Sequence, residues 1–225
     1  MKKRVKRKFN FFRFIIFILI IYIIYLVISY ILDVNTKNII ILNTNYYSDE
    51  EIIETASLEN YPKFLSLSTK EVEDNLLKLP LIETVDVKKK WGYILEIDIK
   101  EKTILYYIRS NNTYMLSDNK EYNLDNVLSC ATLINYVPED IETKFVNGLS
   151  KIDKDILGRI SEIEYSKTSY DDERFLLYMT DGNQVYINIS KIEMLNKYLS
   201  IIQKLDNKKG ILYLDSGNYF EIKEK

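Results

Sequence analysis

The chain contains no histidine and only one cysteine, Cys130, among its 225 residues. Without histidine it cannot form a Ser-His-Asp triad, a Cys-His dyad or a His-ligated zinc or iron site. A single cysteine cannot form an intrachain disulfide bond, so the chain must fold without one. These absences exclude several enzyme classes at once, and we expect neither a metal nor a cofactor.

Glycine is also scarce, with six residues in all, and no glycine-rich phosphate-binding loop is present. Residues 117–120 (SDNK) contain both Ser-x-x-Lys and Ser-Asp-Asn, which penicillin-binding proteins carry as separate stretches. Because the two motifs overlap here, we interpret the segment as a turn, in which Ser, Asp and Asn are common. The sequence therefore predicts a protein that is not an enzyme and has no small-molecule substrate.

Acidic residues are absent from the first 32 positions, and residues 14–32 (FIIFILIIYIIYLVISYIL) carry no charge at all. A helix of this length reaches about 28 Å, close to the hydrocarbon thickness of a bilayer. It has no polar face of the kind that an amphipathic soluble helix shows. We therefore predict a transmembrane helix at residues 14–32.

The residues before this helix form a basic tail, residues 1–13, which sets the direction of the span. By the positive-inside rule the tail is cytoplasmic and residues 33–225 lie outside the cytoplasm. A cleaved signal peptide is the alternative, but the apolar run exceeds the usual length of about 7–15 residues and lacks a small-x-small cleavage site. The seven cations of the tail are Lys2, Lys3, Arg4, Lys6, Arg7, Lys8 and Arg13.

The rest of the chain is acidic. Removing these seven cations from the 31 Lys and Arg leaves 24 against 33 Asp and Glu, a net charge of −9. A nucleic-acid-binding protein shows a basic footprint instead, so we expect no nucleic-acid partner.

Residues 33–103 predict one strand, two helices and two further strands, in that order. Ser48 with Glu51, and Ser68 with Glu71, have the spacing of capping boxes at the two helix starts. A three-stranded sheet with both helices on one face would bury the apolar sides together. The expected strands are 38–42, 82–87 and 94–99, the last two joined at a hairpin turn, residues 91–93.

Residues 104–225 predict a mixed, antiparallel-rich β domain with helices, which makes the fold class α+β. Helical patterns cover residues 138–148 and 151–160, and Ser190 with Glu193 suggests a third capping box that opens a helix to about Leu205. The expected strands are 104–108, 113–116, 162–166, 175–180, 184–189, 211–214 and 219–222.

Several segments carry a family resemblance. They are residues 41–52 (ILNTNYYSDEEI), 79–87 (LPLIETVDV), 89–97 (KKWGYILEI), Glu101, 114–120 (YMLSDNK) and 210–220 (GILYLDSGNYF). In this order, after a single span, they resemble the FtsQ/DivIB family of bacterial cell-division proteins. Four positions depart from the family pattern: Thr44 and Lys120 each replace a glycine, Gly92 replaces a proline and Tyr213 an acidic residue.

The resemblance implies a single-pass membrane protein with a β-α-α-β-β POTRA domain at 33–103 and a β domain at 104–225. It implies a non-enzymatic scaffold of the divisome, enriched at the division septum, that docks bitopic division proteins of the FtsB/DivIC and FtsL type. The alternative is a membrane-anchored POTRA module of a different envelope assembly, for export or sensing.

The last strand pair is the expected partner-binding site in this family. A terminal strand can lie at a sheet edge, where its unpaired backbone groups can bind a partner strand. The partner-binding residues expected on this basis are Leu212, Leu214, Gly217, Tyr219 and Phe220. Trp91, the only tryptophan, is expected to lie half buried at its hairpin; full exposure toward a partner is the alternative.

Overall fold

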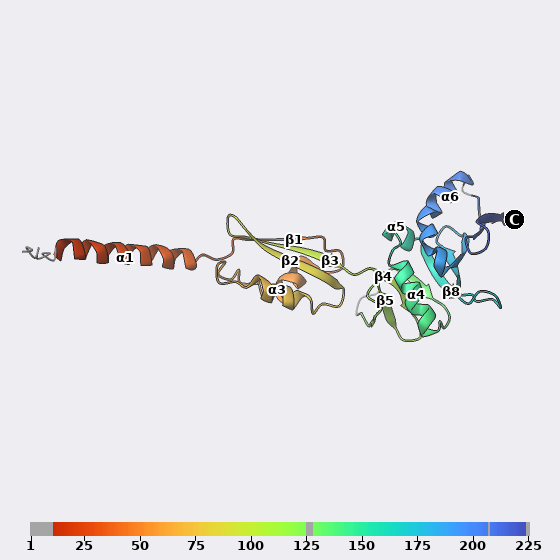
Figure 1. Ribbon diagram of the computed structural model, residues 1–225, viewed down its shortest axis with the longest axis horizontal. Coiled ribbons are helices and arrows are strands. Elements are labelled where there is room, and N and C mark those ends of the chain that lie inside the picture. The colour runs from red at the N-terminus through yellow and green to blue at the C-terminus, as the bar shows by residue number, and fades with distance from the viewer. Residues whose placement is uncertain (1–10, 125–127, 207, 224–225) are drawn as a thin grey trace, which may run out of the picture. The chain divides into compact units, whose positions relative to one another are not determined.

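The computed structural model describes residues 11–124, 128–206 and 208–223 (Figure 1). Its first element is α1 (Phe11–Leu32), a helix of 22 residues, none of which is buried. Within the described residues it is the only helix long and apolar enough to cross a membrane. In the part of the chain that the structure describes, the helix contains the predicted span and also includes Phe11 to Arg13.

The chain divides into two compact units, residues 1–101 and residues 102–225. After α1, the first unit has the predicted order of strand, two helices and two strands. β3 is the central strand of its sheet, parallel to β1 and antiparallel to β2. The elements are β1 (Asn38–Leu42), α2 (Asp49–Thr55), α3 (Thr69–Leu76), β2 (Ile82–Lys90) and β3 (Ile94–Glu101).

Both helices of the first unit begin at the predicted serines. Ser48 accepts a hydrogen bond from the backbone N–H of Glu51, whose carboxylate accepts from the backbone N–H of Ser48, so the capping box is complete. Ser68 accepts from the backbone N–H of Glu71. The apolar sides of the helices then form one core with the sheet, which includes Ile52, Leu58, Val72, Leu76, Leu95, Ile97 and Ile99.

The second unit is built on a nine-stranded sheet in the order β12-β11-β10-β9-β8-β7-β4-β5-β6. Its helices pack with the sheet around one core, which contains Phe145, Phe175, Leu195 and Tyr198. The strands are β4 (Ile104–Ile108), β5 (Thr113–Leu116), β6 (Glu121–Tyr122), β7 (Ala131–Leu133), β8 (Ile160–Tyr165), β9 (Arg174–Met179), β10 (Gln184–Asn188), β11 (Gly210–Tyr213) and β12 (Tyr219–Ile222). The helices are α4 (Glu139–Leu149), α5 (Lys154–Leu157), η1 (Ile189–Lys197) and α6 (Tyr198–Lys204).

Two helix predictions in this unit differ from the structure: the helix at 151–160 is much shorter, and the one from 190 to about 205 is present as η1 and α6 but does not begin as predicted. The pattern at 151–160 gives only the short helix α5, because Gly158 ends it and Ile160 already belongs to β8. At 190, the side chain of Asn188 accepts from the N–H of Ser190, so Ser190 is not the cap. Glu193 pairs with Lys151 instead of completing a box, and the first nine residues form the 3₁₀ helix η1.

Candidate functional site

The last two strands form an antiparallel pair, and β12 is the outermost strand of the nine-stranded sheet (Figure 1). The N–H of Lys223 donates to the carbonyl of Lys209. Because antiparallel neighbours alternate between bonded and non-bonded pairs, the backbone groups of Glu221 and Tyr219 also face β11. Those of Phe220 and Ile222 face the open side of the strand.

The side chains of β12 alternate between the two faces of the sheet. Phe220, opposite Leu212, packs against the core of the second unit, and Leu212 is only 2% exposed. Tyr219, opposite Tyr213, is 51% exposed on the other face. A protein bound along this edge would therefore meet Tyr219 and the backbone of Phe220 and Ile222.

The exposed face carries a row of rings across three strands, Tyr186 on β10, Tyr213 on β11 and Tyr219 on β12, which we term the tyrosine ladder. The centroids of Tyr186 and Tyr213 are 5.3 Å apart, and those of Tyr213 and Tyr219 are 4.5 Å apart. The guanidinium carbon of Arg174 lies 3.7 Å from the centroid of Tyr186. Stacked rings and a cation over a ring are both stabilising, so the ladder holds Tyr219 in a defined position.

An ion pair anchors the turn between the two strands. Arg174 Nε donates to Asp215 Oδ2 at 2.7 Å, and the two side chains are 16% and 8% exposed. Burial acts to raise the pKa of the Asp215 carboxyl, but the hydrogen bonds from Arg174 and Ser216 outweigh it and hold this pKa below its usual value. The pair therefore links β9 to the turn that positions β12.

A buried polar network holds the start of β11. Asn183, 1% exposed, accepts from the N–H of Gly210 at 2.9 Å and donates to Asp181 and to the hydroxyl of Tyr198. The Tyr198 hydroxyl in turn donates to Asp181 at 2.8 Å. A buried amide with these partners fixes where β11, and hence β12, begins.

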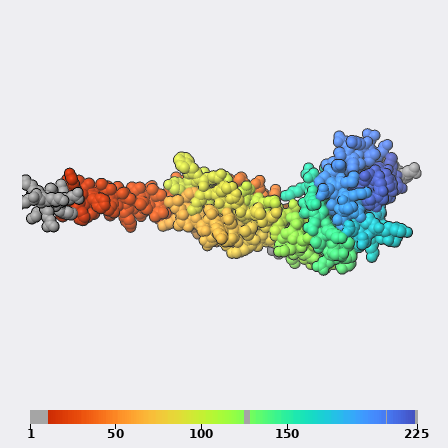
Figure 2. Space-filling view, viewed as in Figure 1, coloured from red at the N-terminus to blue at the C-terminus, as the bar shows by residue number. Residues whose placement is uncertain are grey.

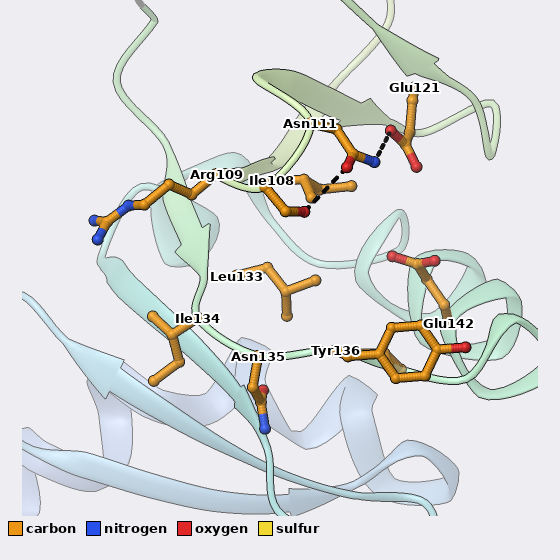
Figure 3. Close-up of a pocket in the computed structure, with 11 residues that line it drawn as sticks. Ile108, Arg109, Asn111, Glu121, Leu133, Ile134, Asn135, Tyr136 and Glu142 are labelled. Atoms are coloured by element: carbon orange, nitrogen blue, oxygen red, sulfur yellow. Dashed lines mark hydrogen bonds between the residues drawn. The ribbon is translucent and has the colours of Figure 1, made fainter.

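A separate pocket of about 600 Å³ opens in the second unit beyond the ends of the parallel strands β4 and β7 (Figure 3). Glu142 from α4 lines it and accepts from the Tyr106 hydroxyl at 2.8 Å. Burial, with Glu121 and Glu139 nearby, raises the pKa of Glu142 against the opposing effect of the Tyr106 bond. On the other side, Glu121 accepts from Asn111 and Thr113. The side chains of Glu142, Glu121 and Asn111, which line the pocket, thus take part in hydrogen bonds within the unit.

Two protein-family models match the chain. The model "POTRA domain, FtsQ-type" matches residues 34–102, and "Cell division protein FtsQ/DivIB, C-terminal" matches residues 106–216. The chain belongs to the FtsQ/DivIB family of cell-division proteins. The second match favours division over the alternative of a POTRA module in another envelope assembly.

Individual relatives of the chain are DivIB proteins of this family. The chain is 31% identical to cell division protein DivIB of Listeria monocytogenes over 185 residues, 77% of this chain and 67% of the relative. It is 26% identical to DivIB of Bacillus cytotoxicus over 194 residues, 83% of this chain and 76% of the relative. A solved extracytoplasmic domain of DivIB from Geobacillus stearothermophilus has a TM-score of 0.40 and 23% identity, covering 48% of this chain and 97% of that one.

The structure distributes the expected partner-binding residues of this family member between surface and core. Leu212 and Leu214 are 2% and 1% exposed, and Gly217 lies in the turn between the strands. Tyr219 is the expected residue whose side chain is most exposed. Of the basic tail, Arg13 lies in α1, whereas Lys2, Lys3, Arg4, Lys6, Arg7 and Lys8 lie outside the described residues.

Sequence reasoning missed the residues that hold the edge in place: Gly210, Asn183, Arg174, Tyr186 and Asp215. One signal was available, because an Asp-Gly-Asn turn inside an apolar hairpin often carries an Asn with local hydrogen bonds. The others act through strand neighbours that are distant in sequence.

Proposed function

We propose that this FtsQ/DivIB-family chain is a non-enzymatic, bitopic scaffold of the divisome, with a cytoplasmic N-terminus and extracytoplasmic domains that act at the septum. Its partners are bitopic division proteins of the FtsB/DivIC and FtsL type. The observation that carries the proposal is the open edge of β12, where the backbone groups of Phe220 and Ile222 face outward. A partner strand that pairs there extends the sheet by one strand.

The side chains around the edge support this mode of binding. Tyr219 is exposed and held by ring stacking on Tyr213, so little side-chain freedom is lost when a partner contacts it. Tyrosine is also enriched at protein interfaces, where it combines apolar area with a hydrogen-bonding group. The edge thus offers backbone pairing for affinity and Tyr219 for selectivity.

The chemistry of the remaining polar groups supports a role other than catalysis. Burial raises the pKa of the Cys130 thiol to about 11, so this thiol is protonated at neutral pH and a poor nucleophile. The hydroxyl of Ser117 accepts from the N–H of Thr103, which places it in a turn that joins two segments of the β domain.

The test uses the full-length chain, co-purified from membranes with each of the two partner types. Proline at 222 removes a backbone N–H that faces outward and leaves the bonds to β11 in place. We expect Ile222→Pro to weaken partner binding at least about tenfold, whereas Ile222→Ala binds within a few-fold of the parent. Equal binding by the two variants would contradict strand addition at β12.

Localisation tests the division role separately. A fluorescent protein fused to the N-terminus, which the orientation places in the cytoplasm, should concentrate at the septum of dividing cells. A uniform membrane signal would contradict the scaffold assignment.

A further inference from the structure

The turn between β2 and β3 carries the only tryptophan of the chain, and its side chain is 99% exposed. Gly92 and Tyr93 turn the chain with positive φ values of 90° and 63°. The expectation that Trp91 is half buried was therefore wrong, because the hairpin extends past the helices that could cover it. Figure 2 shows this yellow-green hairpin as a knob on the surface of the first unit.

The same turn lies at the end of the sheet where the chain arrives from α1. The N–H of Lys37 donates to the carbonyl of Tyr93 at 2.8 Å, and Asn38 is paired with Ile94. Only residues 33–36 separate Lys37 from the last residue of α1, Leu32. Five extended residue steps reach at most about 18 Å, so the turn cannot move far from the end of the membrane helix.

Five lysines lie at this end of the POTRA domain: Lys37 and Lys63, next to the chain that arrives from α1, and Lys88, Lys89 and Lys90, directly before Trp91. The carboxylates that face them are those of Asp33, which pairs with Lys63, Asp86, which pairs with Lys88, Glu96, which pairs with Lys90, and Asp98, which lies opposite Asp86 and also acts on Lys88. Lys89 Nζ lies 3.1 Å from the carbonyl of Leu65, and Lys37 Nζ lies 5.3 Å from the centroid of the Tyr93 ring.

Five lysines against four carboxylates leave this end of the domain with a net positive charge, in a chain whose residues 33–225 are acidic overall. The three ion pairs are exposed, with lysine side chains 56%, 55% and 48% accessible. Exposed pairs of this kind contribute little stability, so these lysines can exchange a carboxylate for a phosphate group at small cost.

From these observations we propose that the β2–β3 turn, residues 88–93, docks on the anionic phospholipid surface of the membrane from which α1 emerges. The indole of Trp91 enters the headgroup region, where tryptophan is enriched in membrane proteins. The lysines bind lipid phosphates. Such contacts are weak for a free domain, but α1 keeps the turn at the bilayer and raises its effective concentration there. Docking would fix the orientation of the POTRA domain on the membrane.

The fluorescence of Trp91 reports on its own environment, since the sequence contains no other tryptophan. The full-length chain is placed in nanodiscs of phosphatidylglycerol and phosphatidylcholine, and in nanodiscs of phosphatidylcholine alone. In the anionic nanodiscs we expect blue-shifted Trp91 emission, most of which is lost when the lipids carry brominated chains near the headgroup. Emission at the wavelength of a water-exposed indole, without bromine quenching, would overturn the proposal.

Charge variants test the role of the lysines. The triple variant Lys88→Glu, Lys89→Glu, Lys90→Glu should lose both the blue shift and the quenching in anionic nanodiscs. The control Lys70→Glu, Lys78→Glu, Lys100→Glu changes the charge of the same domain equally, away from the turn, and should behave as the parent does. Equal quenching in both kinds of nanodisc, unaffected by either triple variant, would overturn recognition of anionic lipid.

Discussion

Gly210, which is opposite Ile222 on the neighbouring strand β12, lies against the backbone carbonyl of Glu221. A Cβ added to Gly210 would come within 2.0 Å of the Glu221 carbonyl oxygen and 2.8 Å of the Phe220 ring. No side chain fits at this position while β12 is paired with β11. The residue at 210 therefore decides whether β12 can pair with β11 and form the outer edge of the sheet.

Gly210→Ala should displace β12 from the sheet, because the methyl group and the Glu221 carbonyl cannot occupy the same space. We expect a loss of roughly 1–3 kcal/mol in the stability of this end of the domain, by overpacking. Hydrogen exchange of residues 210–223 measures this local stability, and partner binding should weaken as the stability falls. Gly158→Ala is the control, since its Cβ would lie 3.4 Å from the Lys154 carbonyl, an ordinary contact. Protection of residues 210–223 in the Gly210→Ala variant would contradict the prediction.

Asn183→Ala should destabilise the second unit by about 1–3 kcal/mol, because the buried N–H of Gly210 loses its acceptor and the Tyr198 hydroxyl loses a partner. Urea unfolding of the full chain in detergent, followed by hydrogen exchange of the second unit, measures the change. Asn196→Ala removes an exposed amide that bonds to Asp153 and should cost well under half as much. Equal costs at the two positions would argue against the buried network.

The Asp215–Arg174 pair makes the edge sensitive to acid. The pKa of Asp215 is lower in the folded chain than in the unfolded one, so the pair stabilises the fold above the unfolded value of about 3.9. This contribution is lost as the pH falls through the folded pKa. At neutral pH, Asp215→Asn should lower stability by about 1.5–3 kcal/mol, and the difference from the parent should shrink below about pH 4. Urea midpoints measured across this range test it; a constant difference would contradict the assignment.

Tyr219 and Phe220 should separate binding from stability, since they lie on opposite faces of β12. Tyr219→Ala should weaken partner binding by about 1 kcal/mol or more with a smaller effect on unfolding. Phe220→Ala should mainly lower stability, by about 2 kcal/mol, because its ring packs against the core. Tyr170→Ala, at a side chain that is 99% exposed in a loop, is the control for both measurements. If Phe220→Ala weakened partner binding more than Tyr219→Ala, the partner would contact the face of β12 that carries Phe220.

Glu101 should stabilise the POTRA domain through its buried carboxylate, which is 6% exposed. It accepts from the backbone N–H groups of Asn45 and Tyr46 at 2.9 and 3.0 Å, and from the Asn45 side chain. Glu101→Ala should cost about 2–3 kcal/mol and Glu101→Gln less, because the amide oxygen can still accept. Glu59→Ala, at an exposed position, is the matched control. Hydrogen exchange of residues 38–101 measures the free energy of unfolding of the first unit in each variant. The expected loss of stability is largest for Glu101→Ala, smaller for Glu101→Gln and smallest for Glu59→Ala.

Local patterns predicted the first unit well, because its signals lie close together in the sequence. Capping residues at Ser48 and Ser68 and the apolar alternation of the hairpin act within a few residues of each other. In the second unit the same reasoning failed where a side chain bonds to a residue other than the one that the local pattern predicts. Glu193 pairs with Lys151 rather than capping a helix, and Asn188 rather than Ser190 accepts the first N–H. The short strands β6 and β7 hold too few residues to show a period.

By itself, the sequence determined the membrane helix, the order of the secondary-structure elements in the first unit and the family. Composition, spacing and motif order are properties of the linear sequence, so no tertiary contact is needed to recognise them. Only the tertiary structure decided which strand is outermost, that Leu212 and Leu214 face inward while Tyr219 faces outward, and that Trp91 is fully exposed. Alternation along a strand shows that neighbours differ, but not which face is buried. That choice depends on contacts between residues far apart in the chain, such as Gly210 with Asn183 and Arg174 with Asp215.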